Sequence, residues 1–272
     1  MLPPFVEASW LSDHAEVVIA DVRSYLDGRD EQEAYLAAHL PGAVFIDLDA
    51  YLAAPPTVTD GRHPLPDPEV FAEGMRQAGI GDDDTVIAYD DDNGVMASRL
   101  VWMLRVTGHR AAVLDGGITA WRGAREQGEV RRSPAEFTAV PWPSELLVGI
   151  DDLDGLQLVD ARPAERYRGE VEPIDARPGH IPGARSLPCR ESSDDRGVLL
   201  PALSLRERYT DLQPGWVSYC GSGVTACHAL LVAEHLGLPP GRLYPGSWSQ
   251  WAGTDRPAEL GQPTQSSSPK TR

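Results

Sequence analysis

The sequence is short of positive charge, of lysine in particular, and of cysteine. Its 272 residues include 41 Asp and Glu against 24 Lys and Arg, which gives a formal net charge of -17. Such a chain repels polyanions, so we expect no nucleic-acid partner and no anionic membrane partner. The single lysine is Lys270, near the end of the chain. Lysine-based catalysis is therefore excluded from the folded part, and any catalytic positive charge must come from arginine.

Cysteine and long apolar runs are also scarce. The chain has three cysteines, Cys189, Cys220 and Cys227. They are too few for a disulfide framework, and an odd number cannot all be paired within the chain. No pair of them has the Cys-x-x-Cys spacing of a zinc site, so we expect no metal. No apolar run approaches the roughly 18 residues of a membrane span, and the first residues lack the basic and apolar segments of a signal peptide. These absences predict a cytoplasmic protein without a membrane partner.

What is present is a globular composition, with 42% hydrophobic and 24% charged residues, and an internal repeat. Four landmarks recur in the same order at offsets of 139, 141, 130 and 130 residues: 17–21 with 156–160, His39-Leu-Pro-Gly-Ala with His180-Ile-Pro-Gly-Ala, 85–89 with 215–219, and Trp121 with Trp251. The repeat predicts two copies of one domain. We expect the first over residues 1–125, a linker over 126–145, the second over 146–256 and a disordered tail over 257–272.

Each copy alternates short apolar runs with helical patterns. In the first copy the expected strands are 17–21, 43–47, 85–89 and 111–115, and the expected helices are 32–38, 68–78 and 97–107. Strands that alternate with helices favour an α/β fold in which a mainly parallel sheet is flanked by helices on both faces. Ligands of such folds bind beyond the carboxyl ends of the strands.

The most informative segment follows one of these strand ends. It reads Tyr219-Cys-Gly-Ser-Gly-Val-Thr-Ala226 and leads from a strand into a helix. The glycines allow the backbone to fold into a bowl whose N–H groups point inward at the start of the helix, which suits an anion and favours a thiolate. Cys220 is therefore a candidate nucleophile. The alternative is a small buried cysteine at a tight turn, which is the reading we favour for Cys227, two helical turns further on.

Taken together, the motifs resemble the two-domain rhodanese-like sulfurtransferases, and among them the 3-mercaptopyruvate type. The resemblance rests on the Cys220 loop, both His-x-Pro-Gly-Ala segments, Ala97-Ser-Arg99, the run from Asp115 to Trp121, and Gly246-Ser-Trp-Ser-Gln-Trp251. It implies tandem rhodanese-like domains of which only the second is catalytic. In the first copy Asp90 stands where Cys220 stands, and the loop is one residue longer.

The resemblance also implies the chemistry. Cys220 would take a sulfur atom from a small anionic donor, keep it as a persulfide, and pass it to cyanide, a thiol or a thioredoxin-like protein, without a metal or organic cofactor. The loop residues Gly221, Gly223, Val224 and Thr225 would hold the anionic sulfur with their backbone N–H groups.

Further site residues follow from the same resemblance. Arg166 and Arg177 are the expected partners of the donor's carboxylate, since a guanidinium matches a carboxylate in a bidentate manner. Ser222, His63 and Asp49 are the expected relay beside the cysteine, with Asp47 and Asp60 as alternatives to Asp49.

Three other functions compete with 3-mercaptopyruvate sulfurtransfer. A thiosulfate donor would use the same persulfide, but the loop carries Gly221 and Ser222 where thiosulfate enzymes of the family carry basic side chains, so a monoanionic donor is favoured. A cysteine phosphatase needs an arginine in the loop, and none follows Cys220 before Arg242. A non-catalytic binding module would suit the first copy alone, which has Asp90 in place of the nucleophile.

Overall fold

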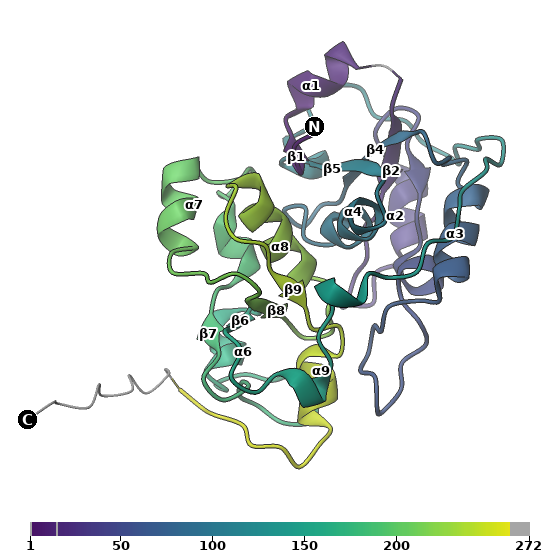
Figure 1. The fold of residues 1–272 in the computed structure, drawn as a ribbon. Coiled ribbons are helices and arrows are strands. Elements are labelled where there is room, and N and C mark those ends of the chain that lie inside the picture. Colours follow the sequence, from purple (N-terminus) through teal and green to yellow (C-terminus); the bar gives the residue numbers. More distant parts are fainter. Residues whose placement is uncertain (1, 15, 262–272) are drawn as a thin grey trace, which may run out of the picture.

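The computed structural model describes residues 2–14 and 16–261, which form two domains, each built on one sheet (Figure 1). The elements of the first domain are β1 (Phe5–Val6), α1 (Ala8–Asp13), β2 (Val18–Asp21), α2 (Glu31–Ala37), β3 (Val44–Phe45), η1 (Leu48–Leu52), α3 (Pro68–Gln77), β4 (Thr85–Tyr89), α4 (Ala97–Val106), β5 (Arg110–Leu114) and α5 (Gly117–Ala120). Those of the second are η2 (Ser144–Leu146), η3 (Ile150–Asp152), β6 (Leu158–Asp160), α6 (Ala164–Tyr167), β7 (Arg185–Ser186), η4 (Cys189–Ser192), α7 (Ala202–Arg208), β8 (Val217–Tyr219), α8 (Ala226–His235), β9 (Arg242–Leu243) and α9 (Ser247–Ala252).

The two sheets have the same topology. The first has the strand order β1-β5-β4-β2-β3 and the second β7-β6-β8-β9, and the strand pairs in both are parallel. Read from β5 and from β9, the order of the shared strands is identical, so the repeat in the sequence is a repeat in the fold. The expected α/β architecture is confirmed. Strand β1 and helix α1 are additions that were not predicted, because so short a strand has no periodicity to detect.

The two domains pack through their most apolar helices. Residues 97–104 of α4 and 226–233 of α8 are buried without interruption, and the two helices contact each other in the middle of the molecule (Figure 1). A helix whose side chains are buried on all sides must be covered on all sides. Each of these helices therefore packs on its own sheet and on the other domain, and one core cluster continues across the boundary.

Local sequence explains where the other helices begin and end. Asp67 precedes α3 and its side chain accepts a hydrogen bond from the N–H of Glu69, while Pro68 occupies the first turn, where its missing N–H costs nothing. The helix ends before Gly79, whose φ of +69° is a conformation that favours glycine. These signals lie within a few residues of each end, which is why this helix could be predicted closely.

Parts of the expected linker and tail lie against the domains. Glu126 forms a bridge with His39, and the segment after it runs along the first domain, where Arg132 donates to the carbonyl of Gly79. Of the expected tail, Glu259 exchanges two backbone hydrogen bonds with His180, and residues 262–272 lie outside the described residues. Among residues 2–14 and 16–261, no helix has the length and apolar character needed to cross a membrane.

Candidate active site

The Cys220 loop joins the carboxyl end of β8 to the start of α8. Gly223 has a φ of +82°, and a Cβ there would lie 2.5 Å from the carbonyl oxygen of Pro245, so only glycine fits. The turn brings the N–H of Gly223 to 3.1 Å from the Sγ of Cys220, which is 1% exposed. The expected bowl of backbone donors around the sulfur is therefore present in part, with one N–H already directed at Sγ.

Helix α9 holds the loop from the other side. The backbone N–H of Cys220 donates to the Oγ of Ser247 at 3.1 Å, and the carbonyl of Cys220 accepts from the N–H of Trp248 at 2.9 Å. Val224 is buried, and Thr225 precedes α8 without a side-chain cap. Because no side chain caps this end of the ten-residue helix, its positive end remains available to a negative charge on the sulfur.

The structure brings together the three residues of the expected relay. The Nδ1 of His63 lies 2.7 Å from the Oγ of Ser222, and its Nε2 lies 3.5 Å from the Oδ1 of Asp49. The two alternatives to Asp49 are engaged elsewhere: Asp47 accepts from the N–H of Ala50, and Asp60 accepts from the hydroxyl of Thr57. The side chain of Asp49 is 75% exposed, so its interaction with His63 is screened by water.

His63 is a neutral imidazole at neutral pH. Burial, together with the positive charges of Arg62 and Arg99, lowers its pKa to about 4. A carboxylate near Nε2 favours the tautomer with the proton on that nitrogen, which leaves Nδ1 free to accept the hydroxyl proton of Ser222. The pair can therefore move a proton without first creating a buried positive charge.

Two guanidinium groups lie close to Gly221 in the loop. A Cβ on Gly221 would lie 2.9 Å from the Nη2 of Arg62 and 3.6 Å from the Nη1 of Arg166. Arg166 was predicted and is near the loop as expected. Arg62 was missed, because a basic residue in a proline-rich loop of the other domain has no local signal; its only sequence clue is that it adjoins His63.

Arg177, in contrast, is not brought to the loop. Its Nη2 donates to the carbonyls of Trp251 and Arg256, and its own carbonyl accepts from the indole N–H of Trp248. These contacts tie the segment before His180 to α9. The arginine that lies beside Gly221 together with Arg166 is Arg62, and the expectation that Arg177 binds the donor finds no support in these contacts.

A second residue whose role was missed is Arg99, which is fully buried at the start of α4. Its guanidinium donates to four backbone carbonyls, those of Leu52, His63, Pro64 and Gly223. Three of these acceptors belong to the first domain and one to the catalytic loop. Arg99 therefore ties the His63 segment to the loop that carries the nucleophile, although the motif Ala97-Ser-Arg99 alone showed only a resemblance.

The corresponding loop of the first domain is closed by its own carboxylate. Asp90 is fully buried and accepts hydrogen bonds of 2.7 to 2.8 Å from four backbone N–H groups, those of Asp92, Gly94, Met96 and Ala97. Burial raises its pKa to about 6, and the four donors favour the ionised form. The place that the Cys220 side chain takes in the second domain is thus filled in the first domain by a carboxylate that its own loop satisfies.

The other two cysteines are unsuited to the same chemistry. Burial raises the pKa of Cys189 and of Cys227 to about 12, so both are thiols at neutral pH. Cys227 donates its S–H to the carbonyl of Gly223 at 3.4 Å. Within the described residues no group of three or more His, Cys, Asp or Glu side chains is placed to hold a metal ion.

Comparison with known proteins matches both halves of the chain to one family. The model of the rhodanese-like domain matches residues 7–124 and again residues 143–254. A relative from Pseudomonas aeruginosa, named as a probable 3-mercaptopyruvate sulfurtransferase, is 41% identical over 254 residues, which cover 87% of this chain and 89% of the relative. A relative from Mycobacterium tuberculosis, named provisionally as a thiosulfate sulfurtransferase, is 38% identical over 252 residues, 87% of this chain and 88% of the relative.

A solved structure agrees with this. The 3-mercaptopyruvate sulfurtransferase of Leishmania major is similar to this chain with a TM-score of 0.84 and 35% sequence identity. The match covers 94% of this chain and 75% of the other. The similarity therefore extends over both domains of this chain.

Proposed function

Because the chain belongs to the rhodanese-like family and is a sulfurtransferase with two copies of the domain, we propose that it moves the sulfur of 3-mercaptopyruvate to a thiol or cyanide through a persulfide on Cys220. The observation that carries the proposal is the surroundings of the Cys220 sulfur. The backbone N–H of Gly223 and the start of α8 lie at the sulfur, and the guanidiniums of Arg62 and Arg166 lie close to Gly221. This arrangement offers one place to a sulfur anion and a second place to a carboxylate.

In the first half-reaction the thiolate of Cys220 attacks the thiol sulfur of the donor. An S–S bond forms, the C–S bond of the donor breaks, and its electron pair remains on the three-carbon fragment as an enolate. The enolate takes up one proton and becomes pyruvate. The persulfide loses the proton that the donor thiol carried, and its negative charge is stabilised by the N–H of Gly223 and by the start of α8.

The proton lost by the donor thiol is the one that the enolate needs. Ser222 and His63 are the groups that we propose to carry it, because their hydrogen bond of 2.7 Å joins a hydroxyl beside Cys220 to a neutral imidazole. Asp49 would hold the imidazole in the required tautomer. Arg99 acts through its backbone contacts as a positioning residue for this group.

In the second half-reaction a nucleophile attacks the outer sulfur of the persulfide. Cyanide leaves as thiocyanate, or a thiolate leaves as a new persulfide, and Cys220 recovers its thiolate in either case. A thioredoxin-like protein is the corresponding protein acceptor. We propose a reducing, cytoplasmic setting for these reactions, which agrees with three free cysteines in the described chain.

Thiosulfate is the second candidate donor. It is a dianion, and the two arginines beside the loop favour an anion in general. Their charges are balanced by Glu172 and Asp175, which pair with Arg166, and Asp175 also pairs with Arg62. With two acidic groups against two basic ones, the site has no surplus positive charge for a dianion. A carboxylate that exchanges with one of the acidic groups suits it better, and we therefore favour 3-mercaptopyruvate.

The test compares both donors with the natural protein, Cys220→Ser and Cys227→Ser. We expect faster turnover with 3-mercaptopyruvate than with thiosulfate, at least ~100-fold loss in Cys220→Ser, and near-normal turnover in Cys227→Ser. Mass spectrometry after donor alone should show one added sulfur atom, which Cys220→Ser lacks. Persulfide formation in that variant would overturn the mechanism, and faster turnover of thiosulfate would overturn the choice of donor.

A further inference from the structure

We infer that Arg62, contributed by the first domain, is a donor-binding residue of the site on the second domain, and that Asp175 holds the place of the donor's carboxylate when the donor is absent. The inference rests on the proposed function, since it names the group that would receive the carboxylate of that donor. It assigns to the catalytically silent domain a direct contact with the substrate.

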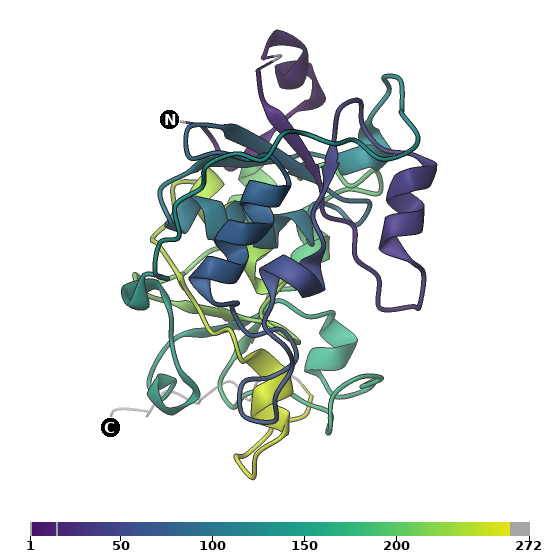
Figure 2. The ribbon, with the colours of Figure 1, turned by 90° about the vertical axis from the view of Figure 1, so that its right-hand side faces the viewer.

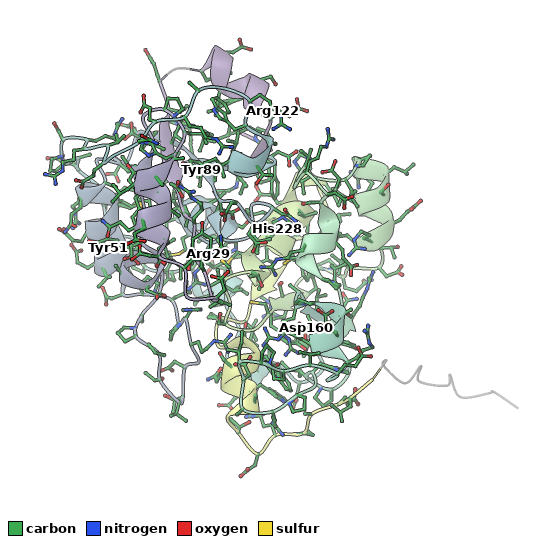
Figure 3. The ribbon with its side chains drawn as sticks, turned by 180° about the vertical axis from the view of Figure 1, so that it is seen from behind. Arg29, Tyr51, Tyr89, Arg122, Asp160 and His228 are labelled. Carbon is green, nitrogen blue, oxygen red and sulfur yellow. The ribbon has the colours of Figure 1, made fainter. Side chains whose placement is uncertain are left out.

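The first argument is a row of alternating charges that leads from the core of the second domain to Arg62. Acidic and basic side chains alternate along the row, in the order Asp160, Arg162, Glu172, Arg166, Asp175 and Arg62. Asp160 ends β6 in the interior of the second domain (Figure 3). The row is electrically neutral, and its outer end is the pair of guanidiniums beside the Cys220 loop.

Asp175 occupies the position between these two guanidiniums. Its Oδ2 accepts from the Nη2 of Arg166 at 2.9 Å, and its Oδ1 pairs with the Nη1 of Arg62. The side chain of Asp175 is 3% exposed, so its charge is compensated by the two arginines rather than by water. A carboxylate held by two guanidiniums is the arrangement that the carboxylate of 3-mercaptopyruvate would require.

The two arginines retain donors that no group of the described chain satisfies. The Nε of Arg62 and the Nε of Arg166 are both buried and lack a hydrogen-bond partner. A buried N–H without an acceptor is costly, and in a native protein it points to a missing ligand or water. Burial lowers the pKa of Arg62, the charge of Arg166 lowers it further, and a thiolate on Cys220 would raise it. An added anion would therefore stabilise both guanidiniums.

The backbone of Arg62 is fixed independently of its side chain. Its N–H donates to the Oγ of Ser249 at 3.1 Å, and a Cβ on the preceding Gly61 would lie 2.7 Å from the carbonyl oxygen of Gly246. The loop that carries Arg62 therefore lies directly against α9 (Figure 2). Because the loop is anchored there, the guanidinium is presented to Gly221 without depending on Asp175.

Exchange of one carboxylate for another preserves the charge balance of the site. When the donor's carboxylate takes the place of Asp175 between the arginines, the neutral row remains neutral, and Asp175 moves toward water. The donor must then displace Asp175, so the affinity for the donor is lower than the two arginines alone would provide. Because of this competition, loss of the Arg62 side chain should raise the KM for the donor, whereas loss of the Asp175 charge should lower it.

The experiment measures KM and kcat for 3-mercaptopyruvate and the inhibition constant of pyruvate in Arg62→Ala, Arg62→Lys, Asp175→Asn and Gly221→Ala. We expect Arg62→Ala to raise KM and the pyruvate constant by about 10- to 100-fold with kcat within about threefold, and Arg62→Lys to restore part of the loss. Asp175→Asn should lower KM by about threefold or more. Gly221→Ala should raise KM, because its Cβ would displace the end of Arg62.

The matched control is Arg190→Ala, which removes a second arginine that pairs with an aspartate across the domain boundary, Asp92 of the silent loop. It should leave KM and the pyruvate constant unchanged. An unchanged KM in Arg62→Ala, or a KM raised by Asp175→Asn, would overturn the inference while the proposed function stands. Absence of turnover of 3-mercaptopyruvate by the natural protein would instead overturn the proposed function. Thermal melting of each variant separates loss of binding from loss of the fold.

Discussion

The Nδ1 of His63 in the first domain lies 2.7 Å from the Oγ of Ser222 in the catalytic loop of the second. The first domain thus supplies an ionisable group to a site whose nucleophile it lacks. The same boundary is crossed by Arg99, which donates to the carbonyl of Gly223. We therefore expect the catalytic unit to be the pair of domains, with the silent copy as part of the site.

His63→Ala should lower kcat for 3-mercaptopyruvate by about 100-fold and leave KM nearly unchanged, because in the proposed mechanism His63 handles a proton and other residues hold the carboxylate. Steady-state kinetics at saturating donor measure the change. Since the pKa of His63 is about 4, its protonation should not contribute an inflection to kcat near neutral pH. The double variant His63→Ala with Ser222→Ala should lose little more than either single one if the two act as a unit. Full additivity of the two losses would separate their roles.

Asp90→Ala should destabilise the protein without changing KM. The substitution leaves four buried N–H groups without their acceptor, and we expect a loss of about 3 kcal/mol or more in the free energy of unfolding. Urea denaturation measures this loss. The control is Asp30→Ala, since the exposed Asp30 accepts from the N–H of Glu33 at the start of α2. We expect that variant to lose about 1 kcal/mol. Equal losses in the two variants would contradict the internal-anion role of Asp90.

Asp90→Cys should not create a second active site. The catalytic loop contacts His63 of the first domain through Ser222, whereas the silent loop contacts Arg190 of the second domain through Asp92. Arg190 and Asp49 stand 190 − 49 = 141 residues apart, the same offset as His180 and His39. The two loops thus receive equivalent segments from opposite domains, and only one of these segments carries the relay. Activity in Asp90→Cys with Cys220→Ser would show that the relay is dispensable.

Arg99→Met should lower both stability and kcat, because the substitution keeps the length of the side chain but leaves four carbonyls without their donor. We expect a loss of about 3 kcal/mol in the free energy of unfolding and a fall in kcat with little change in KM. Urea denaturation and donor kinetics measure the two effects. The control for stability is Arg105→Met. Arg105 lies on α4 and pairs with Glu234 on α8, so the substitution removes an ion pair between the two helices. A lower stability with normal kcat would restrict Arg99 to a structural role.

His228→Leu should reduce the loss of stability in acid. His228 lies between the domains (Figure 3), its ring nitrogens lack hydrogen-bond partners among the described residues, and burial lowers its pKa to about 4, with a further contribution from the charge of Arg190. Between pH 4 and 6.5 only the unfolded chain binds the proton, so stability falls as the pH falls through that range. The imidazole of His228 should account for a loss of about 3 kcal/mol in the free energy of unfolding across this pH range.

Urea denaturation at pH 7 and pH 4.5 measures this difference, and other acid-sensitive groups cancel between the variant and the natural protein. The exposed His14 provides the matched control as His14→Leu, which should leave the pH dependence unchanged. If His228→Leu and the natural protein lose the same free energy of unfolding between pH 7 and pH 4.5, His228 is already accessible to protons in the folded state.

The expectations that depend on neighbouring residues were the ones that agreed best with the structure. The strand at 85–89 and the start of α3 at Pro68 coincide with the predicted ones, because alternation, a capping aspartate and a proline act within a few residues. The relay of His63, Ser222 and Asp49 came only from the family resemblance, and the structure brings these side chains together. That they carry the proton remains a prediction.

The sequence by itself determined that the chain is a tandem repeat of one α/β domain, that it belongs to the rhodanese-like sulfurtransferases, and that Cys220 is the candidate nucleophile, because a strand, a glycine-rich turn and a helix start are consecutive in the chain. Only the tertiary structure decided that Arg62 rather than Arg177 faces Gly221. Arg62 and Gly221 belong to different domains, and their contact depends on how α4 packs on α8 and on where the loop meets α9. Such packing sums weak contacts between distant segments, and no local pattern of residues records it.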